Sequence, residues 1–343
     1  MGRTGTRLVV PKPLEVRLET SVVDDPGPRE VLIRNDYTVM NLGTEMTIFT
    51  GDFPPGSWWD RHIKYPNWEG WGCLGTVVAV GAEVTSLAVG DRVVGDGAHG
   101  NYYLAPMEQP DFPQRIGEGV SDEQGGLWSL SRVSLHGVRV ARLQIGEAVV
   151  VLGQGIIGQL ALRYARLAGA FPVIVVDLSA GRLALSRRGG ATHTLQGPID
   201  QLADEIARIN KGRPVDCVIE ATGNPAAIPF ALRLPRQRGR VIILGSPRGI
   251  SQVDFHDEIH FGVDVLGAQW DTYPQVESPL APWTTARNGE LYLDLVRAGV
   301  LNVDGLISHT FSWREAPDVY RQVREDRTRF MAVRFDWRDC PDQ

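Results

Sequence analysis

Cysteine is scarce in this chain of 343 residues, and the three present, Cys73, Cys217 and Cys340, lie far apart. They therefore offer neither a disulfide framework nor the closely spaced pairs of a zinc-binding knuckle. Apolar runs of membrane-spanning length are also missing, and the first five residues lack the apolar stretch of a secretory signal. We therefore expect a soluble, cytoplasmic protein that does not enter a membrane.

Clustered positive charge is missing as well. The formal net charge is -6, and lysine and arginine form no dense tract. Because proteins bind the phosphates of nucleic acids through clustered positive charge, we expect a small-molecule ligand instead. What the chain does contain, 43% hydrophobic and 22% charged residues, is ordinary for a globular protein. Its length is sufficient for two domains with separate cores.

Two kinds of pattern divide the chain. Up to about residue 118, short apolar stretches alternate with glycine and proline, which predicts an all-β domain. From Ser131, strands that are apolar on successive residues alternate with amphipathic helices, which predicts a parallel sheet covered by helices. We predict domains at 1–130 and 131–270, and a segment, 271–343, that returns to the first domain. Phe330–Trp337 alternates as an edge strand would.

The second domain opens with a glycine-rich turn. The apolar run Val149–Leu152 leads into Gly153-Gln-Gly155-Ile156-Ile157-Gly158 and then into a helical pattern. Gly153 permits the tight turn, Gly155 leaves room for a pyrophosphate, and Gly158 lets the helix lie against the sheet. Free N–H groups at the helix start, at Ile156 and Ile157, favour an anion. The pattern predicts a doubly wound, Rossmann-type dinucleotide site.

An acidic residue stands where such a site needs one. The next apolar strand ends at Asp177, about twenty residues beyond the turn. A carboxylate there accepts hydrogen bonds from both ribose hydroxyls and repels a 2′-phosphate, so we predict NAD as the cofactor. Arg182 lies close in sequence and would soften this preference if it reached the ribose.

Two later strands end in small residues. Val218–Gly223 and Val241–Ser246 each run from a buried strand into a turn. Ligands of doubly wound sheets lie beyond the carboxyl ends of the strands. We therefore expect the nicotinamide side of the site to be lined by Thr222, Gly223, Gly245 and Ser246, although small residues are also common in turns.

Several motifs together resemble the zinc-type medium-chain alcohol and polyol dehydrogenases over essentially the whole chain. They are the turn with Asp177, Gly81, Val89-Gly-Asp-Arg-Val93, Glu220-Ala-Thr-Gly-Asn224 and Glu315-Ala-Pro317. Leu42-Gly-Thr-Glu45, Gly51 and Tyr65-Pro66 look most like the branch that contains bacteriochlorophyllide dehydrogenase. The resemblance implies an α/β protein with a GroES-like catalytic domain, a Rossmann domain and hydride transfer between them. It also implies a homodimer.

The metal ligands of that family are missing. The resemblance places Leu42, Trp71, Gly72 and Ser129 where the family has its catalytic zinc ligands. Zn²⁺ needs thiolate, imidazole or carboxylate, and the four-cysteine structural loop is also absent, so we predict no zinc. His256 and His260 would share one helical face, but no third ligand is evident, and we interpret them as a surface or interface pair.

Without a metal, another group must handle the proton of the substrate oxygen. Thr44 aligns with the hydroxyl residue that begins the family's proton relay, and Glu45 follows it. Glu45 is either a base or a side chain that holds the loop. His99 is a further candidate because histidine side chains commonly exchange protons near neutral pH, although the alternative is an ordinary surface-loop histidine. His62 and Lys64 are weaker candidates.

The chain has nine tryptophans. Flat rings stack on the C–H faces of sugars, cyclitols and aromatic systems, so we predict a substrate pocket lined by Trp58, Trp71, Trp128 and Ser129, with Trp270 over the nicotinamide. The alternative for each tryptophan is a core or lid position. We therefore expect an NAD-dependent dehydrogenase that acts on a secondary alcohol or ketone of a polyhydroxylated or ring-bearing molecule. A quinone or enone reductase and a catalytically silent, NAD-binding or redox-sensing protein remain alternatives.

Overall fold

A computed structural model describes residues 3–68, 70–107, 112–260, 262–269, 272–274 and 276–342. Its contacts divide the chain into two compact units, residues 1–130 with 274–343 and residues 131–273. The second unit ends at residue 273, whereas the sequence pattern placed that boundary at residue 270. None of the helices in the described ranges is long and apolar enough to cross a membrane.

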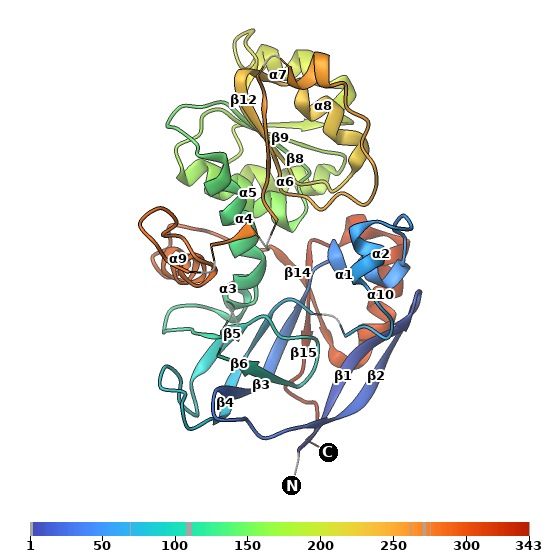
Figure 1. Ribbon diagram of the computed structural model, residues 1–343, viewed down its shortest axis with the longest axis vertical. Coiled ribbons are helices and arrows are strands. Elements are labelled where there is room, and N and C mark those ends of the chain that lie inside the picture. Colours follow the sequence, from blue (N-terminus) through green and yellow to red (C-terminus); the bar gives the residue numbers. More distant parts are fainter. Residues whose placement is uncertain are drawn as a thin grey trace. The chain divides into compact units, whose positions relative to one another are not determined.

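Unit 1, residues 1–130 and 274–343, is rich in β-structure (Figure 1). A hairpin of β1 (Arg3–Lys12) and β2 (Glu15–Val23) stands beside a seven-stranded sheet of order β14-β15-β3-β4-β5-β7, in which β6 also pairs with β3. The strands of this sheet are β3 (Glu30–Met40), β4 (Cys73–Val80), β5 (Arg92–Gly95), β6 (Tyr102–Pro106), β7 (Gln114–Arg115), β14 (Ile307–Ser312) and β15 (Ala332–Asp336). Its helices are α1 (Thr44–Thr50), α2 (Trp58–His62), α3 (Asp122–Gly126), α9 (Thr285–Arg297) and α10 (Ala316–Glu325).

The prediction of an edge strand at Phe330–Trp337 is wrong. β15 lies inside the sheet, antiparallel to β3 on one side and parallel to β14 on the other. Phe330, Val333, Phe335 and Trp337 are all buried in a core cluster. The alternation of apolar and polar residues was misleading because it does not show how many neighbours a strand has. The second neighbour, β14, comes from an earlier part of the chain, and its pairing with β15 leaves no trace in the sequence of β15 itself.

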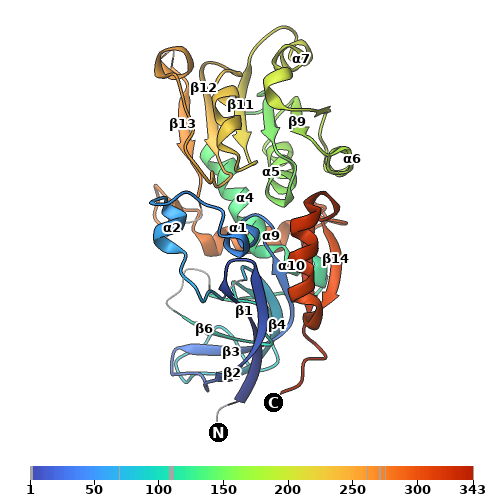
Figure 2. The ribbon, with the colours of Figure 1, turned by 90° about the vertical axis from the view of Figure 1, so that its right-hand side faces the viewer.

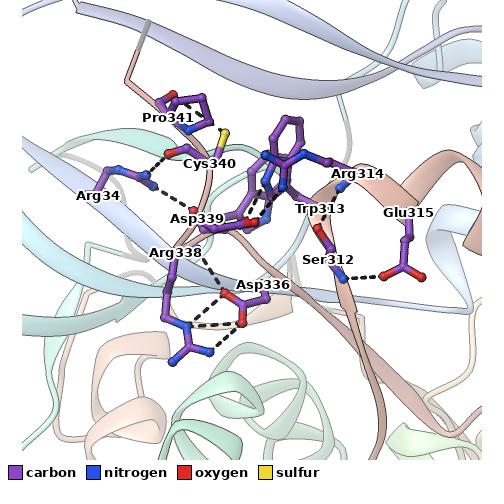
Figure 3. Close-up of polar contacts among 11 residues, drawn as sticks. Arg34, Ser312, Trp313, Arg314, Glu315, Asp336, Arg338, Asp339, Cys340 and Pro341 are labelled. Atoms are coloured by element: carbon purple, nitrogen blue, oxygen red, sulfur yellow. Dashed lines mark hydrogen bonds and ion pairs between the residues drawn. The ribbon is translucent and has the colours of Figure 1, made fainter.

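Polar contacts hold the last residues of the chain, 336–341, against the rest of unit 1 (Figure 3). Asp339 accepts hydrogen bonds from Trp313 Nε1 at 3.0 Å and from Arg314 at 2.7 Å. The guanidinium of Arg34, on β3, donates to the carbonyl of Cys340. Both ends of the described chain therefore finish at the same side of unit 1 (Figures 1 and 2).

Unit 2, residues 131–273, is a doubly wound α/β unit. All six strands are parallel in the order β10-β9-β8-β11-β12-β13, and Figure 2 shows β13 at one edge. The strands are β8 (Val149–Leu152), β9 (Val173–Asp177), β10 (His193–Gln196), β11 (Val215–Glu220), β12 (Pro235–Ile243) and β13 (Asp264–Gly267). Its helices are α5 (Ile156–Leu167), α6 (Ala180–Arg188), α7 (Ala203–Ile209) and α8 (Ile228–Leu232), and α4 (Trp128–Ala141) begins in unit 1.

The topology of unit 2 decides where a ligand can bind. β8 is followed outward by β9 and β10, whereas the chain then crosses to β11 on the other side of β8. The strand order therefore reverses between β8 and β11, and the carboxyl ends of both strands lie at that switch point. Val149–Leu152 is almost fully buried, as expected for a strand covered on both faces.

Candidate functional site

The glycine-rich turn follows β8 directly, and its backbone requires glycine at two positions. Gly153 has a φ of +83°, and a Cβ there would lie 2.9 Å from Thr222 Cγ2. A Cβ on Gly158 would lie only 1.8 Å from the carbonyl oxygen of Gly153. The first glycine thus allows the left-handed turn, and Gly158 allows α5 to approach it.

Gly155 has a different role. It is the N-cap residue of the twelve-residue helix α5, with a φ of −66°, and a Cβ there would meet nothing within 4 Å. The glycine is therefore not required by the fold, and its missing side chain leaves open space in front of the helix start. Ile156 and Ile157 form the first two positions of α5, where backbone N–H groups favour an anion. The turn fits the pyrophosphate of a dinucleotide.

Asp177 is the last residue of β9 and is bonded to the turn. Its Oδ2 atom accepts a hydrogen bond from the Gln154 N–H at 2.6 Å, and its Oδ1 atom accepts one from the Ser179 N–H at 2.8 Å. Each carboxylate oxygen has a further lone pair, so the group can still accept from ribose hydroxyls. Arg182 lies in the first turn of α6, where its N–H is capped by Ser179.

The carboxyl ends of β11 and β12 meet as predicted from the topology. Gly223 has a φ of +66°, and a Cβ on it would lie 2.9 Å from the Ser246 carbonyl oxygen. The Gly245 N–H donates to the Glu220 carbonyl at 2.7 Å. The four small residues Thr222, Gly223, Gly245 and Ser246 therefore lie together at the switch point.

The side chain of Glu220 holds this turn by hydrogen bonds, a role that was not predicted from the sequence. Its Oε1 atom accepts hydrogen bonds from the Thr222 N–H, at 2.7 Å, and from the Thr222 hydroxyl. Its Oε2 atom is buried and has no hydrogen-bond partner in the part of the chain that the structure describes. Burial is the largest cause that raises the pKa of this carboxyl. The Glu-Ala-Thr-Gly run was visible in the sequence, but the sequence did not show that the glutamate side chain turns back to the Thr222 N–H and hydroxyl.

In unit 1, Glu45, in the first turn of α1, and His99, just before β6, form a buried pair. His99 Nε2 lies 3.0 Å from Glu45 Oε2, and neither side chain exposes any surface. His99 Nδ1 lies 2.6 Å from Thr38 Oγ1, which also accepts from Trp337 Nε1 at 2.8 Å. The interpretation of His99 as a surface-loop histidine is therefore wrong: the sheet and the C-terminal strand enclose it.

Further contacts favour the loop-holding interpretation of Glu45. Tyr320, on α10, donates its hydroxyl to Glu45 Oε2. Glu45 Oε1 accepts from the backbone N–H of Asn41 at 2.6 Å. Both oxygens are thus engaged by protein groups in the interior. Thr44, the neighbouring residue, is partly exposed, and its Oγ1 atom lies 3.1 Å from Asn41 Nδ2.

The residues at the family's zinc-ligand positions do not suit a metal. Leu42 is 3% exposed and belongs to the apolar core cluster that contains Met40, Met46 and Phe335. A Cβ on Gly72 would lie 3.7 Å from Ser129 Cβ, so these two positions do come together. They bring only a hydroxyl to a site that needs thiolate, imidazole or carboxylate.

Other candidate metal ligands give no cluster either. In the described ranges, no group of three or more His, Cys, Asp or Glu side chains could hold a metal ion. His256 and His260 stack with their ring centres 5.1 Å apart, on and just after the short π-helical segment Phe255–Ile259. Cys73 is buried, which raises the pKa of its thiol to about 12.

The tryptophans fall into different environments. Trp128 is 1% exposed, its Nε1 atom donates to Gln114 Oε1 at 3.0 Å, and Gly289 of α9 lies against its ring. These contacts favour the core alternative for Trp128. Trp71 is half-buried, and Trp58 is 46% exposed. Trp270 lies outside the described residues.

The weaker catalytic candidates belong to the loop around α2. His62 stacks on Trp58 with ring centres 4.4 Å apart, and its Nδ1 atom lies 2.8 Å from the Trp58 carbonyl oxygen. Lys64 donates to the Asp60 carbonyl at 2.7 Å. Both side chains are exposed and hold the loop by local hydrogen bonds.

Comparison with known proteins agrees with this arrangement. The alcohol dehydrogenase GroES-like domain family matches residues 27–117, and the zinc-binding dehydrogenase family matches residues 157–285. The fold and these matches define an oxidoreductase of the medium-chain dehydrogenase type. The chain belongs to the superfamily of zinc-type medium-chain alcohol and polyol dehydrogenases.

Similar proteins extend over nearly the full chain. Sorbitol dehydrogenase from Bacillus subtilis is 26% identical, with 93% of each chain covered. D-guloside 3-dehydrogenase from Escherichia coli K12 is 28% identical, with 85% of this chain and 88% of that protein covered.

Solved structures share the fold. An alcohol dehydrogenase from Escherichia coli CFT073 complexed with NADH gives a TM-score of 0.82 at 19% identity, covering 97% of this chain and 99% of that one. A dehydrogenase structure from Sinorhizobium meliloti bound to NADP gives 0.79 at 23% identity, with the same coverage.

Proposed function

We propose that this chain is an NAD(H)-dependent oxidoreductase that interconverts a secondary alcohol and a ketone in a polyhydroxylated or ring-bearing small molecule, without a metal ion. The observation that carries the proposal is the position of Asp177 at the end of β9, bonded to the N–H of Gln154 in the phosphate turn. A carboxylate at that place accepts from ribose hydroxyls and repels a 2′-phosphate. The substrate class is supported by relatives named for sorbitol and D-guloside.

The residues of unit 2 would hold the cofactor in three parts. Gly155 and the start of α5 would take the pyrophosphate, Asp177 the adenosine ribose, and Thr222, Gly223, Gly245 and Ser246 the nicotinamide side. Arg182, in the first turn of α6, is the candidate for an additional contact to the adenosine half. When bound, the nicotinamide supplies or accepts the hydride. The protein positions the reacting carbon and manages the charge on the oxygen.

Thr44 is the group that we assign to the substrate oxygen. Glu45 and His99 are fully buried and hydrogen-bonded to protein partners, so we assign them the task of fixing the Asn41–Glu45 loop. Thr44 is partly exposed at the start of α1. Its hydroxyl can donate to a carbonyl oxygen or accept from an alcohol. For the substrate ring, we assign Trp58 and Trp71, which are exposed and half-buried, in preference to Trp128.

The absence of zinc is part of the proposal. Leu42 in the apolar core and the Gly72–Ser129 pair support it, because neither supplies a ligand set. Metal analysis of the purified protein should give no stoichiometric zinc, and a chelator should leave turnover intact. Stoichiometric zinc, with activity lost on chelation, would overturn this part.

The central experiment measures binding and turnover separately. NADH and NADPH are titrated by fluorescence, and a panel of polyols, cyclitols, secondary alcohols, ketones, quinones and enones is then screened at the nicotinamide absorbance. NADH should bind more tightly than NADPH, and turnover should appear with alcohols or ketones. Preference for NADPH with enone or quinone turnover would instead indicate a quinone or enone reductase. Tight NADH binding without turnover would indicate a silent, sensing protein, which the burial of Glu45 and His99 favours as second candidate.

We further propose a homodimer formed through β13. In the described part of the sheet, β13 pairs only with β12, and Val265 on it is 42% exposed. An open edge strand presents unpaired backbone groups that a second copy can satisfy. Light scattering should give twice the chain mass, and Val265→Pro should give the monomer. Because the three cysteines are unpaired and buried, we also propose a reducing, cytoplasmic location.

A further inference from the structure

Asn41 makes a pair of hydrogen bonds that fixes how its side chain points. Its Oδ1 atom accepts from the backbone N–H of Gly43 at 3.1 Å, and its Nδ2 atom lies 3.1 Å from Thr44 Oγ1. A backbone N–H can only donate, so the amide oxygen must face Gly43. The amide nitrogen must then face Thr44, and the alternative flip of the amide is excluded.

This orientation determines the polarity of the Thr44 hydroxyl. The amide nitrogen has hydrogens but no available lone pair, so Thr44 Oγ1 is the acceptor in this contact. The hydroxyl hydrogen of Thr44 must therefore point elsewhere. Within the residues that the structure describes, this hydroxyl donates no hydrogen bond, and the side chain is partly exposed. Thr44 is thus preset to donate to an incoming group.

The interior of unit 1 holds Asn41 in place. Its backbone N–H donates to Glu45 Oε1 at 2.6 Å, and Glu45 is itself bonded to His99 and Tyr320. These contacts tie the loop to the segment before β6 and to α10. Because Glu45 and His99 are completely buried, the loop cannot turn without exposing or unpairing a buried polar group, which is costly.

We propose that Asn41 is a positioning residue that sets Thr44 as a hydrogen-bond donor to the substrate oxygen, so that the site recognises a carbonyl oxygen better than a hydroxyl. The inference rests on the proposed function. A carbonyl oxygen can only accept, and in its reduction negative charge builds on that oxygen, where a preset O–H donor stabilises it. An alcohol must also donate its own hydroxyl hydrogen. Thr44, whose Oγ1 atom already accepts from Asn41, is a poorer acceptor for that hydrogen.

The variant Asn41→Asp tests the polarity directly. The introduced carboxylate keeps an acceptor toward Gly43 but replaces the amide donor with a second acceptor, so that Thr44 donates to this carboxylate and turns its lone pairs outward. The probes are cyclohexanone and cyclohexanol, whose affinities for the protein with NAD+ and with NADH, respectively, are measured by saturation-transfer NMR, since neither complex can react.

The expected result is a change in the ratio of the two affinities. Asn41→Asp should weaken cyclohexanone binding about tenfold, the loss of one good hydrogen bond, while cyclohexanol binding changes by less than about twofold. Asn41→Ala, which removes the donor without adding charge, should shift the ratio in the same direction by less. An unchanged ratio in both variants would overturn the inference.

Two controls separate the effect of Asn41 on the Thr44 hydroxyl from a general structural effect and from a failure of the proposed function. Asn302→Asp adds the same charge in a similar turn, where Asn302 Oδ1 accepts from the Asp304 N–H at 2.9 Å, and should leave the ratio unchanged. In a Thr44→Val background, Asn41→Asp should have no further effect on the ratio; an undiminished effect there would overturn the role through Thr44. NADH binding is measured first: its absence contradicts the proposed function, whereas normal NADH binding with an unchanged ratio contradicts only the role of Asn41.

Discussion

His99 Nε2 lies 3.0 Å from Glu45 Oε2, and both side chains are completely buried in unit 1. The pair joins the first turn of α1 to the segment before β6, 54 residues further along the chain. A hydrogen-bond network thus holds these segments together, with Thr38, Tyr320 and Asn41 among its other members.

Removing one member of the pair should destabilise unit 1 strongly. His99→Ala leaves the Glu45 carboxylate buried with one fewer donor, for which we expect a loss of about 3 kcal/mol in the free energy of unfolding. Tyr320→Phe removes one hydroxyl and should cost about 1 kcal/mol. Denaturant unfolding measures both. Equal, negligible losses in both variants would show that the network does not hold the loop.

Gly155 and Gly158 should respond differently to alanine. Gly158→Ala places a Cβ 1.8 Å from the Gly153 carbonyl oxygen and should lower both Tm and NADH affinity. Gly155→Ala meets nothing within 4 Å in the protein, so Tm should be unchanged, while NADH affinity falls at least about tenfold because the Cβ occupies the phosphate space. Gly181→Ala, on α6, is the matched control and should leave the NADH affinity unchanged. Unimpaired NADH binding by Gly155→Ala would place the pyrophosphate elsewhere.

Asp177→Ala should weaken NADH binding selectively. The substitution removes the acceptor for the ribose hydroxyls and the repulsion of a 2′-phosphate, so the NADH to NADPH affinity ratio should fall by about tenfold. Fluorescence titration of both cofactors provides the ratio within one protein sample. A ratio equal to that of the parent would remove Asp177 from the ribose site.

His136 should make the stability of unit 2 depend on pH. Burial, with the charge of Arg139, lowers the pKa of His136 to about 4, from an ordinary value of 6.5, and its Nε2 atom lies 2.8 Å from Thr272 Oγ1. The unfolded chain therefore binds a proton more readily than the folded one. The stability contribution is complete above pH 6.5 and is lost as pH falls from 6.5 to about 4, by up to roughly 3 kcal/mol.

Unfolding measured at several pH values tests this dependence. His136→Gln should flatten the profile between pH 6.5 and 4, whereas His193→Gln, at an exposed histidine, should leave it as in the parent. A parent profile that is already flat over this range would show that His136 can be protonated in place.

The features that the sequence predicted well are encoded within short segments. The turn at Gly153–Gly158, the strand that ends at Asp177 and the parallel sheet of unit 2 follow from apolar runs, glycine spacing and helix periodicity. Each depends on neighbours within about twenty residues.

The features that the sequence left open depend on contacts between distant segments. Periodicity reports that a residue is buried or exposed, but it does not name the partner. His99 became a buried residue because β3 and β15 enclose it, and β15 became an interior strand because β14 pairs beyond it. Trp128 is packed by Gly289, which lies far along the chain on α9.

By itself, the sequence determined the glycine-rich turn, the acid that follows it and the division into a β-rich and an α/β part, since backbone conformation and local apolar pattern are encoded in adjacent residues. Only the tertiary structure decided that Glu45 and His99 form a buried network and that Asn41 sets the polarity of Thr44. The physical reason is that hydrogen-bond direction depends on which donors and acceptors the folded chain brings within about 3 Å of each other.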